Sequence, residues 1–327
     1  MTNKISTLIN LASPKLGSLG VKANDEFFAP LKRMLSDNEP IFIPDKYDDH
    51  GKWMDGWETK RRRVPGNDWC LIKLGSPGII KEIDVNTKFF TGNYPPKTSI
   101  EGIYSESEPN IDDKKWLNIL EKVDLDGDKI NKFGVKKKNI VNWIKVNIYP
   151  DGGIARLRLW GDVYQNWDNF DNNKIIEISA LKNCGKIISY NNAHYGDVSA
   201  LLSEGRGKNM GDGWETRRRR EPGNDWIIIE LGKKARLEEV EVDTAFFKGN
   251  FPESCSVEGV NADGNIENIE NIENLDWTPI ISKTALKADT IHKIKIENKY
   301  KQTIFSHVRL NIFPDGGVSR FRVYGFI

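Results

Sequence analysis

The chain consists mainly of short apolar runs that alternate with polar positions and end at Gly, Pro, Asn or Asp. Residues 226–231, 237–244 and 308–313 are rich in β-branched or alternating apolar side chains, which is the pattern of β-strands. Helical periodicity is scarce, and we expect only two short helices, at residues 26–35 and 198–202. Many short strands without long helices between them predict an all-β protein with an antiparallel sandwich in each half, and a jelly roll is the preferred version.

One alternating strand closes each half of the chain, and its polar face carries arginines. Residues 154–160 and 318–324 both follow a Pro-Asp-Gly-Gly turn. Alternation places Arg156 and Arg320 on the face opposite the apolar side chains. Two interpretations stay open: these arginines pair with acids on a solvated face, or one in each half helps to bind an anionic ligand at the rim of the sheet.

A long polar phrase occurs twice. Asp55-Gly-Trp-Glu-Thr-Lys-Arg-Arg-Arg63 returns as Asp212-Gly-Trp-Glu-Thr-Arg-Arg-Arg-Arg220, and each continues into Pro-Gly-Asn-Asp-Trp. The block Thr87-Lys-Phe-Phe-Thr-Gly-Asn-Tyr-Pro95 likewise matches Thr244-Ala-Phe-Phe-Lys-Gly-Asn-Phe-Pro252. A duplicated core needs only its apolar pattern to persist, so the repeated charges indicate a polar role that both copies share.

The repeat covers nearly the whole chain and predicts two domains. We expect one repeat at residues 16–163, a polar linker at 164–179 and a second repeat at 180–327. The Asn-Ile-Glu run at 265–274 is expected to be a surface loop that tolerates insertion.

Composition narrows the class of protein. With 48 basic and 47 acidic residues, the chain has no overall charge that would favour nucleic acid or an anionic membrane, so the arginine runs are local features. No apolar run is long enough to cross a bilayer, and no apolar signal segment begins the chain. The three cysteines form no Cys-x-x-Cys pair, which suits a reducing compartment, and Cys70 is expected to be a small core residue.

The sequence indicates no cofactor. The four histidines form no metal-binding motif, and the acidic stretch at 124–128 lacks the spacing of an EF-hand, so a surface turn is the preferred interpretation. A divalent metal held by carboxylates that are distant in the sequence stays open.

These residues resemble the allantoicase family. The resemblance rests on the doubled Asp-Gly-Trp-Glu-Thr phrase, the Phe-Phe-x-Gly-Asn-x-Pro block and the Pro-Asp-Gly-Gly-x-x-Arg-x-Arg ending, and it extends from about Leu19 to Gly325. It implies two tandem jelly rolls of the galactose-binding or discoidin-like type. It also implies hydrolysis of allantoate to ureidoglycolate and urea, and a homo-oligomer. The lack of an apolar signal segment predicts a cytoplasmic location, with the peroxisome left open. A tandem discoidin-like carbohydrate-binding protein without catalysis is the alternative.

The implied reaction requires groups that bind a carboxylate, bind ureido arms and transfer protons. The predicted substrate-binding residues are arginines and asparagines of the repeated phrase and the closing strands: Arg61, Arg62, Asn67, Arg156, Arg217, Arg218, Asn224 and Arg320. The predicted catalytic residues are Glu58 and Glu215, together with Glu26 and His194, which differ between the repeats when 191–195 is aligned with 23–27. A buried ion-pair network that only holds the loops is the structural alternative, and one working site or two remain equally open.

Overall fold

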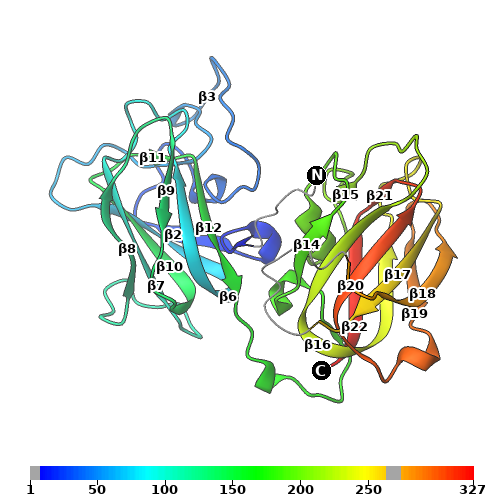
Figure 1. The fold of residues 1–327 in the computed structure, drawn as a ribbon. Coiled ribbons are helices and arrows are strands. Elements are labelled where there is room, and N and C mark those ends of the chain that lie inside the picture. Colours follow the sequence, from blue (N-terminus) through cyan, green and yellow to red (C-terminus); the bar gives the residue numbers. More distant parts are fainter. Residues whose placement is uncertain (1–7, 263–273) are drawn as a thin grey trace. The chain divides into compact units, whose positions relative to one another are not determined.

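The structure is a computed structural model that describes residues 8–262 and 274–327. These residues form two compact β units, Leu8–Tyr164 and a second that begins at Gln165 and ends at Ile327 (Figure 1). The predicted all-β class with two tandem sandwiches is confirmed. The Asn-Ile-Glu run lies outside the described residues except for Asn274.

The first repeat consists of short and long strands with two 3-10 turns. In chain order they are β1 (Ile9–Asn10), η1 (Pro14–Leu16), β2 (Leu19–Ala23), η2 (Leu31–Arg33), β3 (Tyr47–Asp48), β4 (Gly51–Lys52), β5 (Trp57–Glu58), β6 (Asp68–Asn86), β7 (Lys97–Ile103), β8 (Leu117–Asp124), β9 (Ile130–Gly134), β10 (Ile140–Tyr149), β11 (Gly153–Ile154) and β12 (Arg156–Val163).

The second repeat has a closely matching order. Its elements are η3 (Trp167–Asn169), β13 (Ile176–Glu177), η4 (Leu181–Asn183), β14 (Lys186–Tyr190), η5 (Val198–Leu202), β15 (Trp214–Glu215), β16 (Asp225–Asp243), β17 (Ser254–Val260), β18 (Thr278–Ala285), β19 (Ile291–Lys295), η6 (Asn298–Tyr300), β20 (Ile304–Phe313), β21 (Gly317–Val318) and β22 (Arg320–Phe326). Both repeats begin earlier in the structure than the sequence predicted. The first was expected from residue 16, but β1 already pairs with β12. The second was expected from residue 180, but β13, which lies in the expected linker, already pairs with β22.

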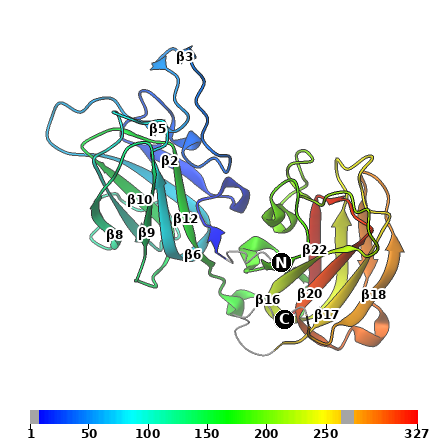
Figure 2. The same ribbon diagram turned by 45° about the horizontal axis from the view of Figure 1, so that its top comes forward.

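One 19-residue strand runs through both layers of each sandwich, β6 in the first repeat and β16 in the second (Figures 1 and 2). The first half of β6 pairs with β2 and β10, and its second half pairs with β9 and β12. The sequence predicted two strands at 226–231 and 237–244, but the structure has one continuous strand there. Its register with β20 shifts between Glu230 and Ala235, where the polar stretch interrupts the apolar pattern.

The helix predicted at 26–35 is largely absent, and only the turn η2 forms there. Pro30 is the N-cap of η2, and its ring disfavours helical geometry at the residue before it. Glu26 accepts a hydrogen bond from the backbone of Leu31 instead of continuing a helix. The second predicted helix is the 3-10 helix η5.

The core of each sandwich is apolar and closely packed, with Trp57 and Trp214 fully buried at matching positions. Cys70 is fully buried, as expected of a core residue, and burial raises the pKa of its thiol far above the usual range. Arg156 and Arg320, however, are both 2% exposed. Of the two open interpretations, the one in which Arg156 and Arg320 pair with acids has the right partners, since each contacts an aspartate. Its solvated face was wrong, because loop residues cover the start of each closing strand.

The Pro-Asp-Gly-Gly turn explains why glycine is required at the start of β11. A Cβ atom on Gly153 would lie 2.0 Å from the ring of Phe90, which is fully buried, and Gly317 has the same relation to Phe247. We expect Gly153→Ala to lower the free energy of unfolding by about 1–3 kcal/mol, the usual cost of overpacking a core. The matched control is Gly134→Ala, because nothing lies within 4 Å of a Cβ there. Urea denaturation of both variants measures the effect, and equal stability would contradict it.

Candidate active site

Glu58 and Glu215 lie at matching points of the two repeats. Glu58 ends β5 and pairs with Gly153 of β11, while Ala29 bridges it from the other side. Glu215 of β15 pairs with Gly317 of β21 in the same way. Backbone hydrogen bonds therefore fix the position of each predicted catalytic glutamate.

Each glutamate accepts a hydrogen bond from an asparagine of the Phe-Phe-x-Gly-Asn block. The amide Nδ2 of Asn93 donates to Oε1 of Glu58 at 2.6 Å, and Asn250 donates to Oε1 of Glu215 at 2.5 Å. Within residues 8–262 and 274–327, no hydrogen bond reaches Oε2 of Glu58. One carboxyl oxygen is thus held by the asparagine, while the other makes no hydrogen bond within the described residues.

The asparagine loop is attached to the glycine turn. The backbone N–H of Gly153 donates to the carbonyl of Asn93 at 2.8 Å, and Gly317 donates to the carbonyl of Asn250 at the same distance. The sequence prediction named the two glutamates but gave no role to Asn93 or Asn250. A signal was present, because an asparagine that recurs at the same position of a repeated block is expected to have a hydrogen-bonding partner.

A strained backbone marks the same block in both repeats. Phe89 has φ 70° and Phe246 has φ 69°, in the left-handed region that bulky residues rarely adopt. Each backbone N–H donates to a carboxylate, that of Asp128 at 2.8 Å and that of Asp289 at 3.0 Å. The acidic stretch at 124–128, interpreted from sequence as a plain surface turn, thus has a defined role in holding this loop. Strain of this kind is concentrated at functional sites.

The predicted substrate-binding residues Arg156 and Arg320 use most of their N–H groups inside the fold. Arg156 Nη2 lies 2.6 Å from Oδ2 of Asp55, and its other nitrogens donate to the carbonyls of Asn38, Asp55 and Ala155. Arg320 makes the matching contacts, including Asp212 Oδ2 at 2.9 Å. The ion-pair interpretation accounts for these contacts, which join each closing strand to the start of the repeated phrase.

Arg62 also pairs within its own repeat. Its Nη1 lies 2.8 Å from Oδ1 of Asp68, which is almost fully buried, and Arg219 pairs with Asp225 at 2.7 Å. Arg61 is exposed, and no ion pair reaches it from the described part of the chain. Arg218 is likewise exposed and unpaired in that part of the chain, whereas the exposed Arg217 pairs with Glu221 at 3.3 Å.

Asn67 and Asn224 close the loop at the start of the long strands. The amide of Asn67 donates to the carbonyl of Asp68 at 3.0 Å and to Oδ1 of Asn147 at 3.4 Å. Asn224 makes the same two contacts, with Asp225 and Asn311.

The structure corrects the alignment around His194 by one residue. The side chain of Asn24 accepts from the backbone N–H of Trp69, and that of Asn191 accepts from the backbone N–H of Trp226. Asn24, and not Ala23, therefore corresponds to Asn191. Glu26 then has Ala193 as its counterpart. His194 is exposed, its ring contacts Tyr195, and its backbone N–H donates to the carbonyl of Glu215.

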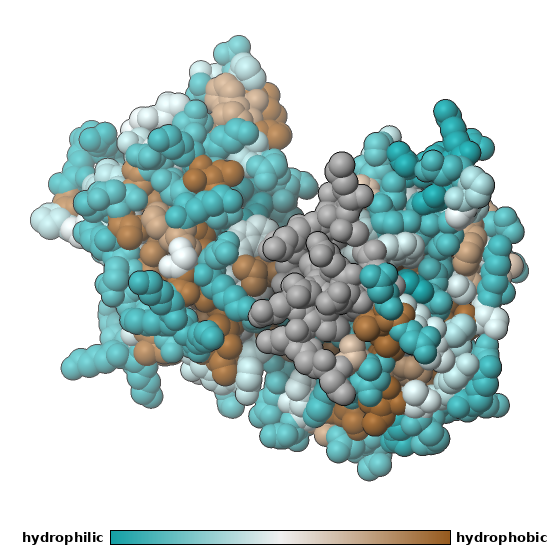
Figure 3. Space-filling view, viewed as in Figure 1, coloured by the Kyte–Doolittle hydropathy of each residue, from teal (hydrophilic) through white to brown (hydrophobic). Residues whose placement is uncertain are grey.

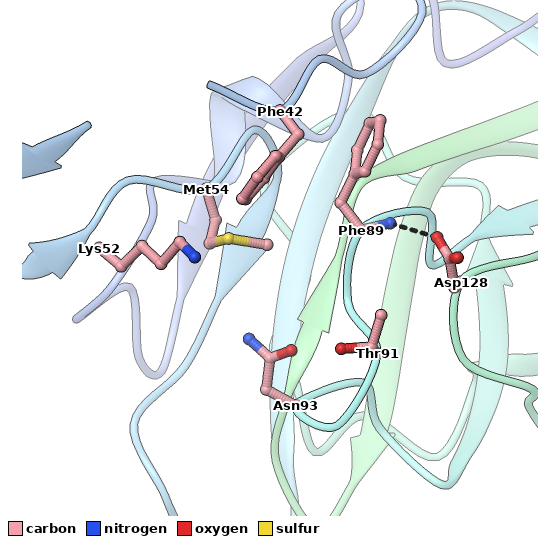
Figure 4. A pocket seen from close by; sticks show the side chains of 7 residues that line it. All are labelled: Phe42, Lys52, Met54, Phe89, Thr91, Asn93 and Asp128. Atoms are coloured by element: carbon pink, nitrogen blue, oxygen red, sulfur yellow. Dashed lines mark hydrogen bonds between the residues drawn. The ribbon is translucent and has the colours of Figure 1, made fainter. Parts of the chain in front are cut away.

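A pocket of about 320 Å³ lies in the first repeat and includes Asn93 in its wall (Figure 4). Its lining residues are Phe42, Lys52, Met54, Phe89, Thr91, Asn93 and Asp128. Figure 4 shows Lys52, Thr91 and Asn93 directed toward one another across the open space, with the Phe42 and Phe89 rings at one end. The pocket therefore combines a cation, a carboxylate, an amide and a hydroxyl with apolar walls. Such a combination suits a small polar ligand.

The environment of Glu58 changes the pKa of its carboxyl. It is 7% exposed, and burial raises the pKa of its carboxyl, an effect that the hydrogen bond from Asn93 reduces but does not cancel. A raised pKa keeps a larger share of the carboxyl protonated near neutral pH.

In the described ranges, no cluster of three or more His, Cys, Asp or Glu has the arrangement of a metal site.

The chain is a duplicated β-sandwich protein in which each repeat pairs a glutamate of a short strand with a loop asparagine. A model of the allantoicase repeat matches this chain twice, at residues 9–164 and 176–327. The probable allantoicase 1 of Burkholderia mallei (strain ATCC 23344) is 45% identical over 317 residues, which cover 97% of this chain and 94% of that protein. The probable allantoicase of Acinetobacter baumannii (strain SDF) is 44% identical over 325 residues, with 99% and 95% covered.

A solved structure gives the same result. The crystal structure of allantoicase from Saccharomyces cerevisiae aligns with a TM-score of 0.83 and 36% identity, covering 98% of this chain and 93% of that one. The chain belongs to the allantoicase family, and the resemblance drawn from the repeated blocks is confirmed.

The raised pKa of Glu58 predicts a pH-dependent stability. A carboxyl whose pKa is higher in the folded than in the unfolded state stabilises the fold below its unfolded pKa, and this contribution is lost as pH rises through the folded pKa. We therefore expect Glu58→Gln to gain stability relative to the wild type as pH increases, by about 1.4 kcal/mol for each unit of pKa difference. Denaturant unfolding between pH 4 and pH 8 measures it. A difference that is independent of pH would contradict the assignment.

Proposed function

We propose that this chain is a hydrolase that converts allantoate and water to ureidoglycolate and urea, a step of purine degradation through allantoin. Membership of the allantoicase family supports this activity. The observation that most supports a catalytic site in the first repeat is the hydrogen bond between Glu58 and Asn93, because Asn93 lines the pocket there. The alternative of a tandem carbohydrate-binding protein without catalysis is not favoured by the family.

The chemistry requires two proton movements. Allantoate carries a carboxylate and two ureido arms on one carbon. A base removes the N–H proton of one arm so that a C=N bond forms, while an acid protonates the nitrogen of the other arm as its C–N bond breaks and urea leaves. Water then adds across the C=N bond, with its hydroxyl on carbon and its proton on nitrogen, which gives ureidoglycolate.

The residues around the pocket suit these roles. Glu58 is the proposed acid, because its pKa is raised and no hydrogen bond from the described residues holds its Oε2. The amide of Asn93 donates to Glu58, so its carbonyl oxygen can accept from a ureido N–H. Asp128 is the proposed base at the opposite wall, and its Oδ1 is oriented by the N–H of Phe89.

We expect the purified protein to release urea from allantoate. Glu58→Gln should lower kcat by about 100-fold or more, the usual contribution of a general acid, and remove the basic limb of the pH profile. A coupled urea assay measures both, and circular dichroism confirms that the variant is folded. No urea over a range of pH, with and without divalent metals, would contradict the proposed activity.

A homo-oligomer in the cytoplasm is also part of the proposal. Large apolar side chains are exposed on the loop that carries β3, including Ile41, Ile43 and Tyr47, and Figure 3 shows apolar surface gathered on this part of the first repeat. Surfaces of this kind mark protein contacts. No helix in the described ranges is long and apolar enough to span a membrane. Light scattering should give a mass that is a multiple of the chain mass, and a monomer at micromolar concentration would contradict this expectation.

A further inference from the structure

The two repeats differ most in the segment that precedes the repeated phrase. Arg156 donates to the carbonyl of Asn38, and Arg320 donates to the carbonyl of Gly205, so these two carbonyls occupy matching places. The chain then continues through residues 39–54 in the first repeat but only through 206–211 in the second before the shared Asp-Gly-Trp-Glu. The first repeat therefore carries an insertion, and the hairpin of β3 and β4 lies within it.

The inserted hairpin is fixed to the body of its repeat. Trp53 donates its backbone N–H to the carbonyl of Lys46 at 2.9 Å, and the ammonium of Lys46 lies 3.9 Å from the centre of the Trp53 ring. Arg33 contacts the same ring, donates to the carbonyl of Met54 at 2.9 Å and pairs with Asp48 at 3.7 Å. These contacts hold the segment that supplies one wall of the pocket.

The insertion contributes three of the pocket residues. Phe42 stacks on the strained Phe89 with ring centres 5.8 Å apart and an angle of 28° between the planes. The ammonium of Lys52 lies 4.7 Å from the centre of the Phe42 ring, and no carboxylate in the described ranges pairs with it. Figure 4 shows this ammonium directed toward the space beside Met54 and Asn93.

The matching positions of the second repeat are built differently. Gly211 replaces Met54 and Lys248 replaces Thr91. Arg206, whose counterpart in the first repeat is Glu39, lies 3.3 Å from Asp243 and 3.3 Å from Asp289, the counterpart of Asp128. In the second repeat the guanidinium of Arg206 therefore neutralises Asp289. In the first repeat the corresponding carboxylate, Asp128, has no cationic partner among the described residues.

We propose that only the pocket of the first repeat turns over substrate, that Lys52 of the inserted hairpin binds the substrate carboxylate there, and that the second repeat serves as a scaffold. This inference rests on the proposed function. The Phe42 and Phe89 rings and the amide of Asn93 line the same pocket, so the proposal places a planar ureido arm beside the rings and a polar end of the substrate near Asn93. The ammonium of Lys52, which has no carboxylate partner in the described residues, supplies the charge that an anionic substrate needs, and a lysine does so as a compact point charge.

The role of Lys52 is tested by a matched set of variants. Lys52→Met keeps the apolar stem and removes the charge, so KM for allantoate should rise by roughly 10- to 100-fold, the contribution of a charge-assisted hydrogen bond, with kcat changed less than about threefold. Lys52→Arg should restore most of the affinity. Lys136→Met, at an exposed lysine of the same repeat that does not line the pocket, is the control and should leave KM unchanged. An unchanged KM in folded Lys52→Met, or an equal rise in Lys136→Met, would overturn the role of Lys52.

The division between the repeats is tested at the paired asparagines. Asn93→Ala should lower kcat/KM for allantoate by about 100-fold, whereas the equivalent Asn250→Ala should lower it less than about threefold, because only the first site holds substrate. Thermal unfolding checks that both variants are folded. Equal losses, or a larger loss in Asn250→Ala, would overturn the division while leaving the activity intact. A wild-type protein that releases no urea would instead refute the proposed function, and the division with it.

Discussion

The buried ion pair between Arg156 and Asp55 holds the site of the first repeat in place. Its two partners lie far apart in the sequence, one at the start of the closing strand β12 and one at the start of the Asp-Gly-Trp-Glu phrase. Leaving one charge of such a pair buried alone costs about 3–5 kcal/mol. The ion pair therefore fixes where the phrase begins, and Trp57 and Glu58 follow within three residues. Arg320 and Asp212 do the same in the second repeat.

A second constraint aligns the asparagine loop with the glutamate. The glycine turn after β10 accepts the buried Phe90 ring only because it has no side chain, and Gly153 then bonds the carbonyl of Asn93. Together with the ion pair, this close contact brings three segments of the repeated sequence to one corner of the sandwich. Both repeats retain this framework, which explains why their charged and glycine residues recur together.

Retaining a framework differs from retaining a site. The first repeat adds an inserted hairpin with Lys52, and the second places Arg206 against its own carboxylates. Duplication allows such divergence, because a second copy can keep its packing role while its polar groups pair with one another. Besides this insertion, single replacements such as Thr91 in the first repeat against Lys248 in the second distinguish the two corners.

Much of this protein could be predicted from its sequence. Alternating apolar positions predicted the strands, and the recurring phrase predicted the duplication and the family. The catalytic roles of Glu58 and Glu215 stay predictions. The helix at 26–35 failed because Pro30 and the Glu26 side chain favour a shorter turn. The solvated arginine face failed because alternation along one strand does not reveal which loops cover it.

The sequence by itself determined the all-β class, the two repeats and the family, because periodicity and spacing are properties of the chain alone. Only the tertiary structure decided that Arg156 holds a loop and that Asn93 caps Glu58. It alone brought Lys52 to a pocket. Hydrogen bonds and ion pairs depend on distances between residues that are remote in sequence, and only the folded packing sets those distances.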